Sequence, residues 1–360
     1  MVKKRILSLD LIRVLAILGV IAIHTENITA SKTNYLGGIS WWFANTIHSL
    51  IAVSVPLFIM ISGALLLSKK DLSSEYVLNK IKKQFFPPLL FWWFFYFMWN
   101  SRALSLIDFK SFFINFFYAD IGHLYFLQII IGLYFFSPIV FKLVKNNFIS
   151  KWLLVLSTVV VMTYEYLSFL VFKTYNQTNL LIIFIPFIVY FVWGYYLSKV
   201  RLKVKQWWFI ALISFVITVF ISYLTFISTN LFIKNNTLFW TPDGGNLLWE
   251  PFTLPVLLLS GMIFVLLNNI KIIFPNIFKS KRNNTFLILL SNISFGVYLI
   301  HPFVLDRLDN IFNLAVHLTE MPLWLYYFYR TSLISIVSSL IVVLISKLKI
   351  FNVLLGIRKE

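Results

Sequence analysis

The chain has 360 residues, of which 60% are hydrophobic and only 12% carry a charge. This composition excludes a soluble globular domain and predicts a protein that lies in a lipid bilayer. The absence of cysteine excludes disulfides, thiolate metal ligands and a cysteine nucleophile. A net charge of +18 would favour nucleic acid as the partner of a soluble protein, so its meaning here depends on where the charges lie.

Ten apolar stretches have the length of about 20 residues that a helix needs to cross a bilayer core. They lie near residues 6–26, 39–68, 85–104, 121–141, 152–172, 180–198, 207–229, 251–270, 285–304 and 323–346. If both termini are cytoplasmic, 23 of the 31 basic residues fall on the inner side, as the positive-inside rule requires. The basic excess then sets the topology, and nucleic acid is not expected as a partner.

We therefore expect one all-α transmembrane domain over residues 1–360, a bundle of about ten helices with cytoplasmic N- and C-termini. The longest outer loop is only about twenty residues long, so no soluble extracytoplasmic domain is expected.

The first span, residues 6–26, contains Asp10, Arg13 and His24. An ionisable side chain at the centre of a span costs roughly 3 kcal/mol, so each asks for a reason. Arg13 and His24 are eleven residues apart, which places them on one helix face about 16 Å from each other along the axis. A histidine, with its ordinary pKa of about 6.5, suits general-base catalysis. Alternatively, Asp10 and Arg13 form a structural ion pair and His24 is an interfacial histidine.

The second span contains His48, followed by Pro56 and the Ser62-Gly63 pair. These residues predict a kink and the close approach of a neighbouring helix, which ordinary packing also explains. The next inner segment carries Lys80 and Lys83. These lysines either anchor the chain at the membrane surface or bind phosphate groups of a cytoplasmic donor.

Further polar residues lie in later spans. His123 and Tyr125 open the fourth span, Glu165 lies within the fifth, and His301 precedes Pro302 near the outer end of the ninth. A histidine with aromatic neighbours is typical of either a membrane-interface belt or a sugar platform, and a carboxylate within a span must face a cavity or a partner. The candidate substrate contacts are Glu26, His48, His123, Tyr125, Glu165 and His301, with Trp41, Trp42, Trp240 and Trp249 as possible sugar-stacking surfaces.

These motifs resemble the acyltransferase-3 family of integral membrane O-acyltransferases along most of the chain. The resemblance rests on LDLIRVLAILGVIAIH in the first span, on SVPLFIMISGALL, HLYF and LYFFSPI, and on the closing SFGVYLIHP. Within the family the chain looks most like stand-alone enzymes that O-acetylate cell-envelope glycans, such as enterobacterial common antigen. The resemblance implies an essential Arg13 and His24 and a cytoplasmic acyl-CoA donor. Many members have an arginine pair where this chain has Lys80 and Lys83.

The expected function is O-acetyl transfer at the bacterial inner membrane, from acetyl-CoA to a hydroxyl of a glycan or lipid-linked sugar. Arg13, Lys80 and Lys83 would bind the donor, and His24 would deprotonate the acceptor, oriented by Asp10 or Glu26. Membrane lipids are the other expected partners, and no metal is expected. The main alternative is a transporter or exporter of a glycan or anion, in which the Asp-Arg-His line relays protons or binds the cargo. A purely structural membrane protein leaves the charges within the span unexplained.

Overall fold

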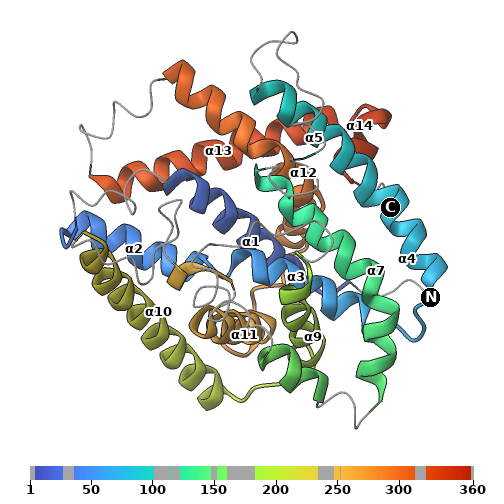
Figure 1. Ribbon diagram of the computed structural model, residues 1–360, viewed down its shortest axis with the longest axis horizontal. Coiled ribbons are helices and arrows are strands. Elements are labelled where there is room, and N and C mark those ends of the chain that lie inside the picture. Colours follow the sequence, from blue (N-terminus) through green and yellow to red (C-terminus); the bar gives the residue numbers. More distant parts are fainter. Residues whose placement is uncertain are drawn as a thin grey trace.

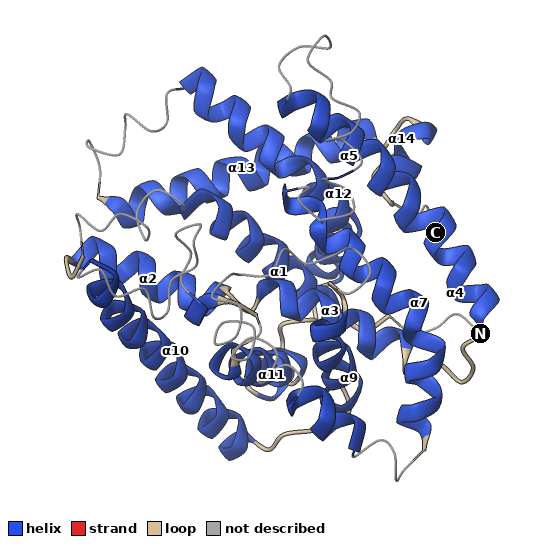
Figure 2. Cartoon of the chain, viewed as in Figure 1, coloured by secondary structure: helices blue, strands red, loops and turns tan. Residues whose placement is uncertain are grey.

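The computed structural model of the chain describes residues 5–26, 36–100, 114, 122–146, 152–159, 183–233, 247–251, 253–312 and 322–357. Within these ranges all regular structure is helical (Figure 2), which confirms the predicted all-α class. The α-helices are α1 (Leu7–Glu26), α2 (Ile39–Ile51), α3 (Ser54–Leu66), α4 (Ser74–Lys80), α5 (Phe86–Asn100), α7 (Tyr125–Lys145), α9 (Ile188–Leu197), α10 (Val204–Ile233), α11 (Leu254–Asn268), α12 (Lys281–Phe312), α13 (Leu323–Ile345) and α14 (Lys349–Leu354). A π-helical turn, Ile81–Phe85, joins α4 to α5, and 3-10 turns span Gly122–Leu124, Ile185–Phe187, Leu247–Trp249 and Ile270–Ile272.

Six described helical stretches are long and apolar enough to cross a membrane: Leu7–Thr25, Ile39–Leu66, Gly122–Lys145, Val204–Leu231, Lys281–Ile311 and Trp324–Ile345. Ile185–Leu197 and Leu254–Asn268 are shorter apolar helices. The predicted span at 152–172 lies mostly outside the described residues, so the number ten stays a prediction. The predicted span at 39–68 is divided between α2 and α3 just before Pro56, whose missing N–H and ring disfavour a continuous helix there.

Helix α1 lies at the centre of the bundle and packs against α2, α3, α11, α12 and α13 (Figure 1). The core is built from the mostly apolar faces of these helices, with Ile12, Ile21, Ile59 and Met60 almost fully buried. A residue of α1 that faces this core is therefore surrounded by other helices, which is the position that a polar side chain needs in order to be sheltered from lipid.

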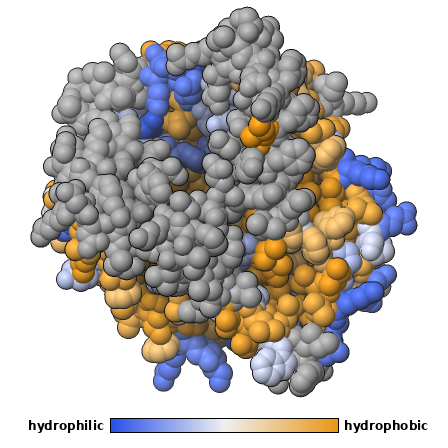
Figure 3. All heavy atoms as spheres, viewed as in Figure 1, coloured by the Kyte–Doolittle hydropathy of each residue, from blue (hydrophilic) through white to orange (hydrophobic). Residues whose placement is uncertain are grey.

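The outer faces of the bundle are apolar as well. At least 60% of the surface of Phe209 and Phe215 on α10 is exposed, and the same holds for Phe328 and Leu344 on α13. Figure 3 shows a broad hydrophobic area on the visible face, with hydrophilic atoms at its lower and right-hand edges. Such large exposed apolar faces suit contact with lipid and are unusual for a soluble monomer.

Helices α3 and α9 touch through their backbones at two glycines. A Cβ atom on Gly63 would collide with the carbonyl of Phe191, and one on Gly194 would collide with the carbonyl of Met60. The predicted close approach at Ser62-Gly63 is thus confirmed, and small residues at helix crossings are a common packing device in membranes.

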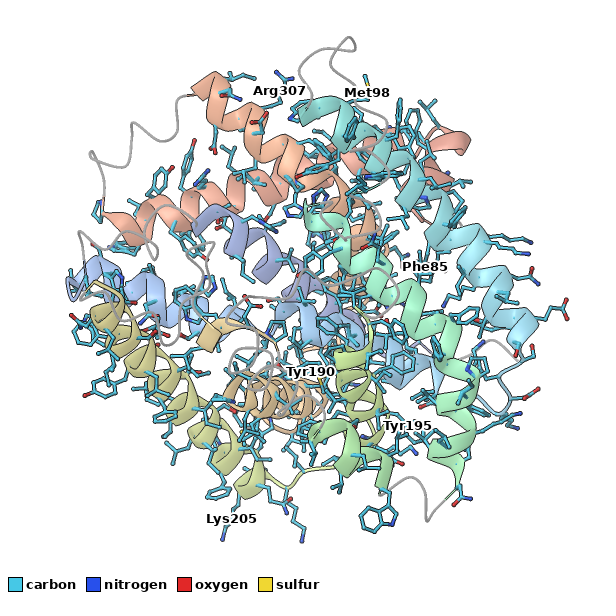
Figure 4. The ribbon with its side chains drawn as sticks, in the orientation of Figure 1. Phe85, Met98, Tyr190, Tyr195, Lys205 and Arg307 are labelled. Atoms are coloured by element: carbon cyan, nitrogen blue, oxygen red, sulfur yellow. The ribbon has the colours of Figure 1, made fainter. Side chains whose placement is uncertain are left out.

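Helix ends that the charge pattern places on one side also meet in space. The Ser8 hydroxyl donates to the Asn268 side chain (3.0 Å), and the Asn268 amide donates to the carbonyl of Ser198 (3.0 Å). Lys205, predicted on the inner side, and Arg307, predicted on the outer side, lie at opposite edges of the molecule in Figure 4. The arrangement agrees with the predicted topology, while the assignment of this end to the cytoplasm stays a prediction.

Candidate active site

The site is organised along α1, which is long enough to present Arg13 and His24 on one face, about three turns and about 16 Å apart along the axis. We call the surroundings of Arg13 the guanidinium end and those of His24 the imidazole end. The two groups are too far apart to touch, and Asp10 lies farther still from His24. Neither Asp10 nor Arg13 can therefore orient the His24 ring directly.

At the guanidinium end, the buried Asp10 carboxylate is the centre of a partly exposed hydrogen-bond network. Arg5 donates to it through Nε (2.8 Å) and Nη2 (3.0 Å), and the Ser291 hydroxyl of α12 donates to Oδ1 (2.6 Å). Arg13 Nη1 donates to the Ser291 oxygen (3.2 Å) and lies 4.0 Å from Asp10 Oδ1. Arg5 also donates to the Asn292 side chain (2.7 Å). Asp10 is thus mainly the partner of Arg5, and the Arg13 side chain, 28% exposed, keeps donors for another group.

The two candidate lysines differ in their surroundings. Lys80, at the end of α4, donates to the phenol oxygen of Tyr134 on α7 (3.2 Å), and Tyr134 also lies within electrostatic range of Arg13. Lys83, in the π-helical turn, is exposed. The structure therefore brings Lys80 to the guanidinium end, while Lys83 lies on the surface nearby.

At the imidazole end, three histidines from distant parts of the sequence meet. The His24 ring of α1 lies 5.2 Å from the His301 ring of α12, measured between centroids, and His301 lies 5.7 Å from His123. His123 and His301 are buried, whereas His24 is half-buried. The site thus joins three residues that the sequence offered only as separate candidates.

A tight turn before α7 positions His123. Gly122 adopts φ +56°, and a Cβ atom there would lie 2.7 Å from the Tyr96 hydroxyl oxygen, so glycine is required. His123 Nε2 lies 3.2 Å from the carbonyl oxygen of Leu299, which can only accept, so this nitrogen carries the proton. The Tyr298 hydroxyl donates to the backbone carbonyl of His123. These contacts tie the turn to α12.

A proline sets the orientation of His301. In a regular helix the carbonyl of Tyr298 accepts a hydrogen bond from the N–H four residues later, but that residue is Pro302, which has none. The freed carbonyl accepts from His301 Nδ1 (2.7 Å). In a neutral ring Nε2 is then the unprotonated nitrogen. This buried atom has no hydrogen-bond partner among the described residues.

The remaining candidates contact other groups or lie outside the described residues. The His48 ring packs against the Trp249 ring (4.1 Å), and Tyr125 lies within electrostatic range of Glu250. Trp41 is fully buried against Trp42 and Phe226, so it offers no face to a sugar. The side chain of Glu26, together with Glu165 and Trp240, falls outside the described residues.

Sequence reasoning missed several residues of this arrangement: Arg5, Ser291, Tyr134 and Tyr298. Arg5 is one of the basic residues that the positive-inside rule explains, so the sequence pattern gives no sign of its contact with Asp10. Tyr298 could have been found, because a carbonyl four residues before a proline within a helix is always left free. Among the described residues, no group of three or more histidine, cysteine, aspartate or glutamate side chains is arranged to hold a metal ion.

The arrangement has two chemical capacities. Arg13 and Lys80 offer cationic donors suited to an anionic group such as phosphate. The imidazoles offer an unprotonated nitrogen in a sheltered place, as proton transfer requires.

Comparison with known proteins agrees with this picture. The model of the family Acyl_transf_3, described as an acyltransferase domain, matches residues 6–346, and so covers both ends of the site. No curated protein and no solved structure matches the chain. Because the match spans nearly the whole length, the chain belongs to the acyltransferase-3 family of membrane acyltransferases.

Proposed function

We propose that this membrane acyltransferase moves an acyl group, in the first instance acetyl, from cytoplasmic acyl-CoA to a hydroxyl of a cell-envelope glycan or lipid-linked sugar. The observation that carries the proposal is the separation of a cationic end from an imidazole end along one central helix. Acyl-CoA has a matching shape, since anionic phosphates at one end are joined by a long flexible arm to a thioester at the other.

In this mechanism Arg13 and Lys80 hold the phosphates, and the thioester reaches the imidazole end. His24 accepts the proton of the acceptor hydroxyl as its oxygen attacks the thioester carbonyl. The new C–O bond forms and the C–S bond breaks. The proton then passes from His24 to the departing sulfur, so the products are the ester and free CoA.

Several features support this assignment over export of a glycan or anion. Arg13 and His24 belong to different networks, and no continuous line of hydrogen bonds between described residues joins them. A proton relay along α1 needs such a line, whereas acyl transfer needs only that the donor span the distance. The family also names acyl transfer as the chemistry.

The test is His24→Ala, assayed with purified protein, labelled acetyl-CoA and isolated envelope glycans. We expect a loss of at least about a hundredfold in the rate of O-acetylation, because general-base catalysis typically contributes that much or more. Lys205→Ala, at the far edge of the molecule, is the control. Unchanged acetylation by a normally inserted His24→Ala protein would overturn the mechanism, and glycan export without any acetylation by the wild-type protein would favour the exporter.

A further inference from the structure

At the imidazole end, Nε2 of His301 is buried and has no hydrogen-bond partner among the described residues. His301 is 0% exposed, its Nδ1 is bound to the Tyr298 carbonyl, and its Nε2 has no hydrogen-bond partner among the described residues. A buried polar atom without a partner costs free energy, commonly about 1 to 3 kcal/mol. A buried atom of this kind in a folded protein therefore needs an explanation.

The local sequence makes this arrangement stable. Pro302 frees the Tyr298 carbonyl, and that carbonyl can be satisfied by the Nδ1 proton of the residue just before the proline. Because a carbonyl cannot donate a proton, this contact excludes the other neutral tautomer of His301. Nε2 is thus held as an acceptor, without any charged residue in contact with the ring among the described residues.

The nearest group that can use this acceptor is His24. The rings lie 5.2 Å apart between centroids and are tilted by 49°. This separation is short enough for one N–H···N hydrogen bond when the His24 ring turns its edge towards His301, and such bonds often tighten only when substrate is bound. His24 is half-buried and has no other hydrogen bond among the described residues, so its ring is free to turn.

We propose that His301 is the positioning residue of His24: its Nε2 accepts the His24 N–H and so turns the unprotonated His24 nitrogen towards the acceptor hydroxyl. This inference rests on the proposed function, in which His24 accepts that proton. The chain of contacts runs from the Tyr298 carbonyl through His301 to His24 and ends at the substrate. When His24 becomes protonated, the positive charge is shared with the His301 acceptor. His301 itself neither gains nor loses a proton in the cycle.

The decisive test compares two substitutions at position 301. His301→Gln places a carbonyl oxygen close to the position of Nε2, so the acceptor for His24 is retained. His301→Asn keeps an N–H donor close to the position of Nδ1 for the Tyr298 carbonyl, but it has no acceptor within reach of His24. The two amides differ by one methylene, so differences in fold are small, and insertion is checked by size-exclusion chromatography.

We expect kcat to fall about a hundredfold in His301→Asn and to recover at least tenfold of this loss in His301→Gln, with the KM values for acetyl-CoA and acceptor within about threefold of wild type. Equal kcat values for the two variants, whether high or low, would overturn the proposal. High values would mean that His301 has no role in positioning, and low values that it handles the proton itself or serves only the fold.

A second variant tests the same idea without removing an imidazole. Pro302→Ala restores a backbone N–H that competes with His301 for the Tyr298 carbonyl, so kcat should fall about tenfold, the effect of one hydrogen bond. Pro138→Ala in α7 is the matched control, because its freed carbonyl, that of Tyr134, accepts from the Ser137 hydroxyl (2.6 Å), and no imidazole is involved. Equal kcat losses in the two proline variants would contradict the inference. If wild-type protein transfers acetyl groups while these tests fail, only the role of His301 is refuted.

Discussion

The two ends of α1 differ in whether their buried polar atoms have hydrogen-bond partners. At the guanidinium end, the Asp10 carboxylate receives three hydrogen bonds from Arg5 and Ser291, and Arg13 shares the Ser291 oxygen. At the imidazole end, His301 keeps a buried nitrogen without a described partner. A network whose hydrogen bonds are satisfied by its own members holds those side chains in place, whereas a buried nitrogen without a described partner can still accept a hydrogen bond. The contrast suggests that the first end binds and the second end does chemistry.

The same backbone device appears in both halves of the molecule. Pro138 and Pro302 each interrupt a long helix, and in each case the residue just before the proline donates to the carbonyl of a tyrosine four residues before it. In α7 that donor is the Ser137 hydroxyl, which has no further task in proton transfer. In α12 it is His301, whose second nitrogen remains available. The carbonyl that each proline leaves free is a structural feature. The residue just before the proline decides whether the bond to this carbonyl also serves catalysis.

The strongest test of the comparison combines one change at each end. Arg13→Lys keeps the charge but loses the planar fork, and we expect about a tenfold rise in the KM for acetyl-CoA. Pro302→Ala lowers kcat about tenfold. Since the two sites share no described partner, their effects on kcat/KM should multiply to about a hundredfold in the double variant.

Steady-state kinetics of the wild type, both single variants and the double variant give this comparison. A double variant no worse than the poorer single variant would mean that the two ends act as one site. In contrast, the kcat losses of His301→Asn and Pro302→Ala should not multiply in the double variant, because both changes act on kcat through the positioning of His24 by His301.

A smaller effect should follow from loosening the guanidinium end alone. Asp10→Asn removes the charge that holds Arg5 and Ser291, so Arg13 loses its fixed position, and the KM for acetyl-CoA should rise about fivefold while kcat stays within twofold. The melting temperature in detergent should also fall, because a partly buried ion pair is broken.

Asp309→Asn is the matched control for that change. Asp309 pairs with the buried Arg330, near the other end of α1, so its loss should lower the melting temperature without changing the KM for acetyl-CoA. An equal rise of that KM in both variants would indicate a general loss of structure and would remove Asp10 from its positioning role.

The smallest expected effect distinguishes the candidate lysines. Lys80→Met should raise the KM for acetyl-CoA about threefold, since Lys80 reaches Tyr134 beside Arg13, and an isolated, partly exposed charge contributes little. Lys83→Met should have a weaker effect, and the exposed neighbour Lys82 serves as the control. A larger effect of Lys83 than of Lys80 would place the phosphates on the surface of the π-helical turn.

Much of this organisation could be predicted because it is local. Helical spacing alone places Arg13 and His24 on one face. The lengths of the apolar stretches predict the six spans that the structure describes, and Pro56 and Gly63 predict the break and the close helix contact. The meeting of His24, His123 and His301 could not be predicted, because it depends on how α1, α7 and α12 pack. The pairing of Asp10 with Arg5 was missed for a different reason. The positive-inside rule already explains a basic residue at the end of a span. The sequence pattern therefore does not reveal that Arg5 also reaches into the bundle and contacts Asp10.

The bond between His301 and the Tyr298 carbonyl also bears on how tightly the membrane is sealed. A protein that opens a path between two compartments risks dissipating the gradient across them, since protons hop along chains of groups that each accept on one side and release on the other. His301 cannot complete such a hop, because the Tyr298 carbonyl accepts a hydrogen bond from Nδ1 but cannot take up the Nδ1 proton and pass it on. In the proposed mechanism, a proton that His24 takes from the acceptor therefore returns to the substrate side and does not pass through His301. Pro302, which interrupts α12, would therefore also prevent protons from leaking across the membrane through His301.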